Sequence, residues 1–327
     1  MTEPDVSVVI CTFQRAASLS VTLESLVAAP GLADAVREIV VVDNGSQDAT
    51  ADVVARWAAR APVPIRRVWE PAVGLSRARN AGVAAARGGI IAFTDDDVAV
   101  DPAWPAAVAA AFRRYPEAVA IGGRIVPAWE GPVPAWLGRD LHRHLALLDL
   151  GDEPRRLTHA DVWGANLALR AGLFAAGAAF DPRRGRRGGK LYDGEESRLL
   201  QDLIDGGAVV LYCPELVVRH RIGPERLRKG YFRRHQFDRG ENEGRLDAAR
   251  PFRRILGMPW WALNLAGQAM GRAALALARR SDRRLDAELE AAFRLGYLRG
   301  SLTGWRARRR PAGDNIDGGI GGAGGRA

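Results

Sequence analysis

Three consecutive carboxylates, Asp95, Asp96 and Asp97, directly follow the apolar segment 90–94. Carboxylates that lie this close repel one another, and a bound divalent cation offsets the repulsion. Mg²⁺ and Mn²⁺ prefer oxygen ligands and readily bridge phosphate oxygens, so the cluster predicts a metal site for a phosphorylated ligand. A solvated acidic turn is the alternative that these residues alone leave open.

Two further acidic positions suit the same chemistry. Asp43 ends the apolar segment 38–43, where it either contacts a ligand or belongs to a capped turn. Glu195 and Glu196 begin an amphipathic helix, and the helix macrodipole favours an acidic cap at that place. The other glutamate is then free to act as a general base.

One histidine, His220, closes the apolar segment 216–220. A neutral imidazole nitrogen is a common ligand of divalent metals, so His220 is a candidate partner of the acidic cluster. An exposed loop histidine is the alternative.

The elements that must position these residues alternate along the chain. Between residue 6 and about residue 125, short β-branched segments alternate with alanine-rich segments, which is typical of βαβ units around a mostly parallel sheet flanked by helices. Ligands of such sheets bind at the carboxyl ends of the strands, where Asp43 and Asp95 lie. The expected strands are 7–12, 38–43, 65–69, 90–94 and 119–126. The expected helices are 17–28, 49–59, 75–87 and 103–115.

The chain becomes less regular after residue 126. Residues 127–160 are rich in Pro, Gly and Trp, and a connection of this length is often functional, for example in acceptor binding. The elements expected after it are a segment 162–170, a Gly- and Arg-rich loop 181–194, a helix 195–205 and strands near 209–213 and 216–220. Residues 311–327 are Gly-rich and predict a tail.

The composition bounds the class of protein. With 327 residues, 47% of them hydrophobic and 26% charged, the chain is globular and long enough for one large α/β domain with additions. Two cysteines are too few for a disulfide framework or a cysteine-built metal site, which favours the cytoplasm. An acidic start and the lack of a long apolar run predict neither a secretion signal nor a membrane span.

The net charge of +9 is concentrated in the C-terminal third, because residues 221–310 contain 22 Lys and Arg against 9 Asp and Glu. A helix is expected from Pro259 on, with Trp260 and Trp261 at the start of a wide apolar face. Its polar stripe consists of Asn264, Gln268, Arg272, Arg279 and Arg283. Such a helix either lies in the interface of an anionic membrane or packs on the preceding domain.

Five segments, in this order and spacing, make the chain resemble the family 2 glycosyltransferases. They are VSVVICTFQR at 6–15, EIVVVDNGSQDAT at 38–50, VGLSRARNAGVAAARGGIIAFTDDDV at 73–98, VWGANLALR at 162–170 and GEESRLLQDLIDGGAVVLYCPELVVRH at 194–220. The resemblance implies a GT-A-like, Rossmann-type domain over residues 1–220 with a mostly parallel sheet. A basic, amphipathic, membrane-associating helical segment over 221–310 and the tail over 311–327 would follow it.

The resemblance also implies roles in binding the donor. Thr12, Phe13 and Arg15 would line the nucleotide pocket, and Asp43 would accept a hydrogen bond from the base. The other residues implied beside the donor are Arg79, Asn80, Asp95, Asp96, Gly164, Ala165 and Asn166. Asp95 and Asp97 match the family's DxD motif, so Asp97, with Asp95 and His220, would hold Mg²⁺ or Mn²⁺ under the diphosphate.

The catalytic base implied by the family is the Asp of a Glu-Asp pair, and the matching pair here is Glu195-Glu196. We therefore expect Glu196 to be the base, while its extra methylene leaves open whether Glu195 faces the acceptor instead. Direct displacement at the anomeric carbon would invert the configuration of the sugar. The QxxRW motif of processive synthases is absent after the pair, which favours transfer of a single sugar.

The resemblance implies a nucleotide-sugar donor, with UDP-linked sugars as the first guess, and a lipid-linked or polysaccharide acceptor. The enzyme would be peripheral on the cytoplasmic face of the cell membrane. A sugar nucleotidyltransferase would need a glycine-rich, lysine-containing loop, which CTFQRAAS at 11–18 lacks. A non-catalytic basic protein that binds membrane or nucleic acid would not need the acidic residues, so we expect no nucleic-acid partner.

Overall fold

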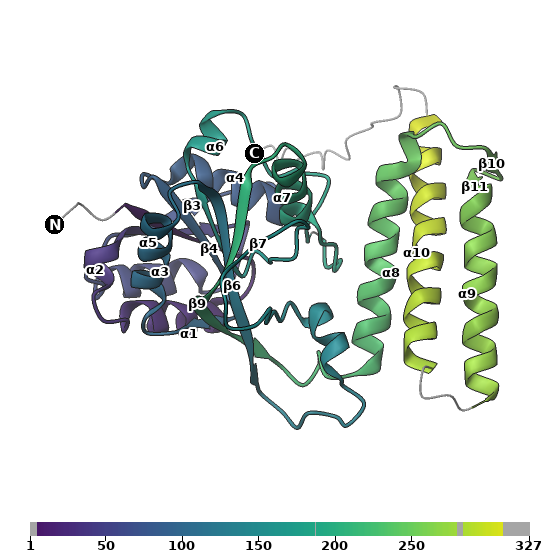
Figure 1. The fold of residues 1–327 in the computed structure, drawn as a ribbon, viewed down its shortest axis with the longest axis horizontal. Helices are drawn as coiled ribbons and strands as arrows, with labels where there is room; N and C mark the ends of the chain where they lie inside the picture. Colours follow the sequence, from purple (N-terminus) through teal and green to yellow (C-terminus); the bar gives the residue numbers. More distant parts are fainter. Residues whose placement is uncertain (1–4, 187, 280–283, 310–327) are drawn as a thin grey trace, which may run out of the picture. The chain divides into compact units, whose positions relative to one another are not determined.

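The computed structural model describes residues 5–186, 188–279 and 284–309. The chain divides into two compact units, Met1–His235 and Gln236–Ala327. The first unit holds a nine-stranded sheet, and the described residues of the second form helices and a short hairpin (Figure 1). Arg283 and the expected tail, residues 311–327, lie outside the described residues.

The sheet of the first unit is mixed but mostly parallel, as the sequence predicts. Its strands are β1 Val6–Thr12, β2 Val36–Asp43, β3 Ile65–Trp69, β4 Ile90–Asp95, β5 Val98–Val100, β6 Ala118–Trp129, β7 Arg155–Arg156, β8 Asn166–Arg170 and β9 Val209–Ile222. They lie in the order β3-β2-β1-β4-β8-β6-β9-β5, with β7 beside β9. β1 to β4 pair in parallel, as do β6 and β9, whereas β8 and β5 run antiparallel to their neighbours.

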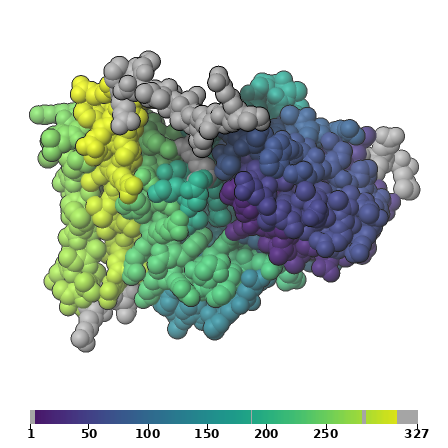
Figure 2. All heavy atoms as spheres, turned by 180° about the vertical axis from the view of Figure 1, so that it is seen from behind, coloured from purple at the N-terminus to yellow at the C-terminus, as the bar shows by residue number. Residues whose placement is uncertain are grey.

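Helices flank this sheet, and the predicted ones are confirmed to within a few residues (Figure 1). They are α1 Ala16–Val27, α2 Leu32–Ala35, α3 Thr50–Ala58, α4 Leu75–Ala85, α5 Trp104–Arg114, α6 Gly172–Ala175 and α7 Glu195–Asp205. A 3₁₀ helix, η1 Arg139–Leu145, lies in the irregular connection. Seen from behind, the N-terminal segments, purple to blue, form one continuous surface (Figure 2). The central strands are buried beneath the flanking helices, which explains their long apolar segments.

Helix α4 lies unusually close to the sheet. A Cβ atom at Gly82 would overlap the side chain of Val9 in β1, so only glycine permits this approach. The same helix carries Arg79, whose guanidinium comes within 3.8 Å of the Asp95 carboxylate at the end of β4. The packing of α4 therefore brings a buried cation to the carboxyl ends of the strands.

One long strand, β9, replaces the two strands expected near 209–213 and 216–220. Pro214 has no backbone N–H to donate, and the register with β6 shifts there from Gly123 opposite Cys213 to Arg124 opposite Val217. The bulge interrupts the ladder of hydrogen bonds without ending the strand. β9 then continues to His220, which lies opposite Val98 of β5.

Among the described residues, the rest of the fold consists of three long helices, the turn η2 Asp247–Ala249 and the hairpin of β10 Arg254–Ile255 and β11 Met258–Pro259. The helices are α8 Lys229–Leu246, which contains the boundary between the units, α9 Trp260–Ala278 and α10 Arg284–Arg309. Within the second unit α10 lies between α9 and residues 236–246 of α8 (Figure 1). A Cβ atom at Gly244 would overlap the main chain of Tyr297, and one at Gly300 would overlap that of Glu241. Glycines thus let the backbones of α8 and α10 touch.

Helix α9 confirms the helix expected from Pro259. Its buried residues are small and its four predicted polar-stripe residues within the described part, Asn264, Gln268, Arg272 and Arg279, are exposed. Arg272 forms an ion pair of 2.8 Å with Glu290 of α10. No helix among the described residues is long and apolar enough to cross a membrane.

We expect Gly300→Ala to destabilise the helical unit, because the added methyl group would overlap the main chain of Glu241. Overpacking of this kind costs about 1–3 kcal/mol. Gly271→Ala is the matched control on α9, since nothing lies within 4 Å of the added Cβ and alanine favours a helix. Urea unfolding followed by circular dichroism compares the two variants, and equal midpoints would contradict close contact between α8 and α10.

Candidate active site

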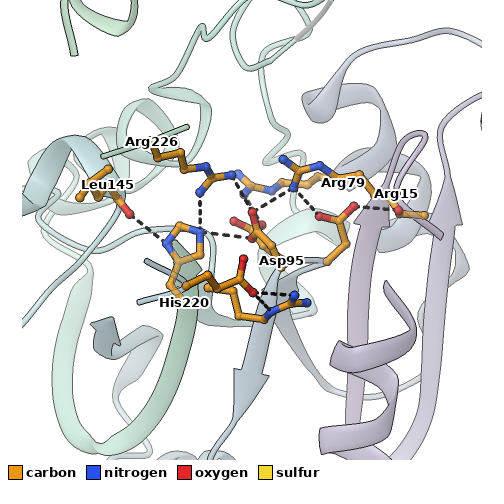
Figure 3. Close-up of polar contacts among 11 residues, drawn as sticks. Arg15, Arg79, Asp95, Leu145, His220 and Arg226 are labelled. Atoms are coloured by element: carbon orange, nitrogen blue, oxygen red, sulfur yellow. Dashed lines mark hydrogen bonds and ion pairs between the residues drawn. The ribbon is translucent and has the colours of Figure 1, made fainter. Parts of the chain in front are cut away.

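In the first unit, the carboxyl ends of β1 and β4 lie near the C-terminal end of β9, and the acidic cluster of residues 95–97 lies there (Figure 3). Asp95 is the exposed member of the acidic cluster, with 36% of its side chain accessible against 7% for Asp96 and 10% for Asp97. The predicted convergence of the acidic residues with His220 is therefore present, although two of the three carboxylates are buried.

Asp96 faces the protein and not the solvent. Its Oδ2 accepts a hydrogen bond from the Thr12 hydroxyl at 2.8 Å, and its Oδ1 accepts one from Arg15 at 2.9 Å. Burial and the neighbouring Asp97 raise the pKa of Asp96 to about 6, against the attraction of Arg15. Thr12 and Arg15, both predicted to line the nucleotide pocket, thus hold the inner side of the acidic cluster.

Asp97 is surrounded by two arginines and a histidine. Its Oδ2 accepts hydrogen bonds from Arg15 at 2.9 Å and from Arg226 at 2.7 Å, and its Oδ1 lies 3.2 Å from Nε2 of His220. Burial alone would raise the pKa of this carboxyl group, but His220, Arg226 and Arg15 outweigh it and hold the pKa well below its usual value. These groups therefore favour the carboxylate form of Asp97.

His220 is oriented by the irregular connection. Its Nδ1 lies 2.9 Å from the carbonyl oxygen of Leu145 at the end of η1, and a carbonyl only accepts, so Nδ1 carries the hydrogen (Figure 3). The other nitrogen, Nε2, points toward Asp97 and Arg226. Metal-ligating histidines commonly donate from one ring nitrogen to such a carbonyl, so Nε2 is the nitrogen of His220 that could bind a metal.

The donor set fits a hard divalent cation only together with a ligand. Among the described residues there is no group of three or more His, Cys, Asp or Glu side chains that could hold a metal by itself. Asp95, Asp97 and His220 supply oxygen and imidazole donors, and Mg²⁺ or Mn²⁺ commonly completes such a partial set with substrate phosphates. The residues present therefore fit a metal that binds with a phosphorylated ligand.

The two glutamates meet on Arg79. Its Nη1 donates to Oε1 of Glu195 at 2.8 Å and to Oε2 of Glu196 at 3.3 Å, while its Nη2 lies 3.8 Å from Asp95. The main-chain N–H of Gly164 donates to Oε1 of Glu196 at 3.3 Å, and a Cβ atom at 164 would overlap the Arg79 guanidinium. Arg79 thus joins the acidic cluster to the glutamate pair, and Gly164 leaves room for it.

The environments of the two glutamates differ. The Glu195 side chain is 4% exposed, and no hydrogen-bond partner for its Oε2 is found among the described residues. Burial and the charge of Glu196 raise the pKa of Glu195 to about 8, although Arg79 opposes them. Glu196 is more accessible, with 11% of its side chain exposed.

Asp43 lies at the end of β2, and both of its oxygens already accept hydrogen bonds. Oδ1 accepts from the main-chain N–H of Ser46 at 2.9 Å, and Oδ2 accepts from Arg67, whose Nε and Nη2 lie at 2.9 and 2.7 Å. The Arg67 guanidinium in turn lies 5.0 Å from the centre of the exposed Trp69 ring. Phe13, which follows β1, is also exposed.

Two residues predicted to lie beside the sugar donor have side chains that form hydrogen bonds with the main chain. Asn80 exchanges two hydrogen bonds with the main chain of Phe180, at 2.9 and 3.0 Å. Asn166 accepts from the indole of Trp104 at 2.8 Å and donates to the carbonyls of Arg124 and Leu216. The structure thus places Asn80 and Asn166 beside the acidic edge as parts of the scaffold, with their side chains satisfied internally.

Sequence reasoning missed Arg226, Leu145 and Arg67. Arg226 lies in the basic segment 221–310, where nothing in the local sequence distinguishes it from the other arginines. Leu145 contributes only its carbonyl group, which no side-chain pattern reveals. The sequence contains one signal for Arg67, because this residue lies two positions before the end of β3, and β3 pairs with the strand that ends at Asp43.

Comparisons with known proteins place the chain in a family. Residues 7–176 match the family model of glycosyl transferase family 2. A glucosyl-dolichyl phosphate glucuronosyltransferase of Haloferax volcanii is 24% identical over 66% of this chain and 69% of its own. The succinoglycan biosynthesis protein ExoM of Rhizobium meliloti is 27% identical over 88% of this chain and 91% of its own.

Two solved structures share the fold. The mannosyltransferase PcManGT of Pyrobaculum calidifontis, in complex with GDP-Man and Mn²⁺, superimposes with a TM-score of 0.56 at 20% identity and covers 90% of this chain and 88% of that one. GalNAc-T7 with UDP, GalNAc and Mn²⁺ has a TM-score of 0.51 at 19% identity and covers 76% of this chain and 51% of that one. These likenesses confirm the predicted GT-A-like fold.

The raised pKa of Glu195 predicts a pH dependence of stability. Between about pH 4.5 and pH 8 the folded protein keeps a proton that the unfolded chain releases, so the free energy of unfolding falls as the pH rises through this window. Glu195→Gln removes the titrating group. The stability of this variant relative to wild type should therefore increase from pH 5 to pH 8, by up to about 1.4 kcal/mol per pH unit.

Urea unfolding at several pH values measures the difference. Glu215→Gln is the control, because it removes a carboxylate whose side chain is 53% exposed. A difference between Glu195→Gln and wild type that stays constant or shrinks with rising pH would contradict the raised pKa.

Proposed function

The chain belongs to glycosyl transferase family 2 and is a glycosyltransferase, and on this premise we propose that it moves one sugar from a nucleotide-sugar donor to an acceptor hydroxyl, with inversion and with a divalent metal. The observation that carries the proposal is the shared contact of Arg79 with Asp95 on one side and with Glu196 on the other. A metal-binding carboxylate and a candidate base therefore lie within the width of one guanidinium group.

The base we propose is Glu196. It is the more accessible of the two glutamates, and the N–H of Gly164 together with Arg79 orients its carboxylate. A carboxylate within hydrogen-bond reach of the acceptor hydroxyl takes its proton as the oxygen attacks the anomeric carbon. Glu195 is more deeply buried and accepts the shorter hydrogen bond from Arg79, so it is suited to hold Arg79 in place instead.

The leaving group is a nucleoside diphosphate, whose negative charge grows as the glycosidic bond breaks. Asp95, Asp97 and His220 would hold the metal, which when bound supplies positive charge to the diphosphate oxygens. Arg15 donates hydrogen bonds to both Asp96 and Asp97, and it thereby keeps the Asp97 carboxylate in place. Since the displacement occurs in a single step, the configuration at the anomeric carbon is inverted.

The nucleotide would lie along the ends of β1 and β2. Thr12, Phe13, Arg15 and Asp43 are at this edge, and the exposed Phe13 ring offers an apolar surface to a base. The Mn²⁺ in the two similar structures, one with GDP-Man and the other with UDP and GalNAc, supports a nucleotide-sugar donor and a divalent metal. We propose UDP-linked sugars as the first donors to test, and GDP-linked sugars as the second.

The acceptor we propose is a lipid-linked or polysaccharide intermediate at the inner face of the cell membrane. Relatives named for glucosyl-dolichyl phosphate and for succinoglycan biosynthesis support this class. The exposed side of α9 carries large apolar side chains, among them Trp260, Met270 and Leu277, beside its exposed arginines. An apolar stripe beside arginines is the surface that suits an anionic lipid interface.

Replacing Glu196 with Gln should lower turnover about a hundredfold or more, because the amide keeps the shape of the side chain but cannot accept a proton. Donor affinity should be nearly unchanged, since the base does not contact the diphosphate. Turnover and nucleotide binding are measured with a panel of nucleotide sugars in the presence of Mn²⁺. Glu195→Gln is the matched comparison and should have the milder effect on turnover.

Two results would count against this assignment. A larger loss of turnover in Glu195→Gln than in Glu196→Gln would make Glu195 the base. Transfer that continues at the full rate in excess EDTA would remove the divalent metal from the mechanism.

Membrane association is tested by sedimentation with vesicles. The protein should bind vesicles with anionic lipid more strongly than neutral ones and be partly released by high salt, because each basic residue near an anionic surface contributes on the order of 1 kcal/mol. Arg279→Glu should weaken this binding more than Arg272→Glu, since Arg272 already pairs with Glu290. Equal binding to neutral and anionic vesicles, or none to either, would contradict an electrostatic anchor.

A further inference from the structure

Arg226 is a buried arginine in the turn between β9 and α8, outside every motif considered above. Its Nη1 lies 2.9 Å from Nε2 of His220, and its Nη2 donates to Oδ2 of Asp97 at 2.7 Å. The guanidinium thus contacts two of the three groups that would hold the metal (Figure 3). A side chain that links Nε2 of His220 to Asp97 occupies the region where a cation bound by both would lie.

The polarity of the hydrogen bonds leads to the same conclusion. The carbonyl of Leu145 places a hydrogen on Nδ1 of His220, so Nε2 of a neutral ring has only a lone pair to offer. That lone pair accepts from Arg226, but it also faces Oδ1 of Asp97, another acceptor, at 3.2 Å. If Nε2 carries a hydrogen, it suits Asp97 and opposes the Arg226 donor. Either protonation state leaves one contact unfavourable.

A divalent cation removes this conflict because it accepts electron pairs from Nε2 and Oδ1 together. We propose that Arg226 acts as an internal substitute for the metal, holding Asp97 and His220 until the cation arrives, and that metal binding displaces its guanidinium, which then binds the diphosphate of the donor. This inference rests on the proposed metal-dependent function. Arg15 would remain in place, because Asp96 also holds it and it contacts only Oδ2 of Asp97.

The proposal makes opposite predictions for the metal and for the nucleotide. If the arrangement with Arg226 displaced makes up about a tenth of the metal-free protein, the apparent affinity for the metal alone is reduced about tenfold. Removing Arg226 should therefore strengthen binding of the metal alone. It should weaken binding of the nucleoside diphosphate, which loses a charged hydrogen-bond donor. If Arg226 formed only a structural ion pair, its removal would not strengthen binding of the metal and weaken binding of the nucleoside diphosphate at the same time.

The experiment follows Mn²⁺ by the loss of its free electron paramagnetic resonance signal, first without nucleotide and then with UDP or GDP. Arg226→Gln should bind Mn²⁺ alone about tenfold more tightly than wild type, and should bind the nucleoside diphosphate with Mn²⁺ at least several-fold more weakly. Arg226→Lys keeps the charge but cannot contact Asp97 and His220 together, so it should also bind Mn²⁺ more tightly while recovering part of the nucleotide affinity.

Two controls make the result specific. Arg221→Gln removes an arginine of the same segment that pairs with Glu130 at 2.6 Å, so it corrects for the loss of one positive charge and should leave both affinities unchanged. Asp97→Ala should lose binding of Mn²⁺. Circular dichroism and the melting temperature show which variants are folded, and Arg226→Lys carries the test if Arg226→Gln does not fold.

The outcomes separate this inference from the proposed function. If wild type binds Mn²⁺ with nucleotide but the folded Arg226 variants bind Mn²⁺ alone no more tightly than Arg221→Gln, the substitution role is overturned and the metal-dependent function stands. Tighter Mn²⁺ binding with unchanged nucleotide affinity overturns the transfer of Arg226 to the diphosphate. If no folded protein binds Mn²⁺ under any condition, the metal-dependent function and the inference both fail.

Discussion

The structure of the site depends on the repulsion between carboxylates at the carboxyl ends of the strands. Asp96, Asp97, Glu195 and Glu196 are all largely buried, and a buried carboxylate is costly unless it is paired. Three arginines from separate segments supply that pairing: Arg15 before α1, Arg79 on α4 and Arg226 after β9. The buried carboxylates are therefore paired only when these three segments pack in place on the sheet.

Arg79 makes the site a single unit. Its contacts with Asp95 and with both glutamates tie the acidic cluster to the glutamate pair, so a shift of α4 would move both together. This coupling constrains the neighbouring sequence, because α4 needs Gly82 to approach β1 and the guanidinium needs Gly164 to fit. The two glutamates also differ in exposure. Glu195, which accepts the shorter hydrogen bond from Arg79, is less accessible than Glu196.

Two residues of the predicted site serve its scaffold. Asn80 and Asn166 belong to motifs that resemble donor-binding segments, yet their amides satisfy main-chain groups of Phe180, Arg124 and Leu216. Such bonds fix β8 to β6 and β9 and fix α4 to the segment at Phe180, because a buried amide or carbonyl left without a partner is costly. A motif in the sequence therefore identifies a place in the fold more securely than it identifies a contact.

The sequence by itself determined the α/β class, most strand and helix limits and the position of Asp43 and Asp95 at one edge of the sheet, since apolar periodicity and turn residues are local signals. The place of His220 beside the acidic cluster followed only from the family resemblance. Only the tertiary structure decided which cation neutralises which carboxylate. Asp97 and Arg226 are 129 residues apart, and their contact depends on the sheet order and on the bulge that carries β9 past Pro214. Local patterns cannot distinguish one arginine of a basic segment from another, because ion pairing is set by distance in space and by burial.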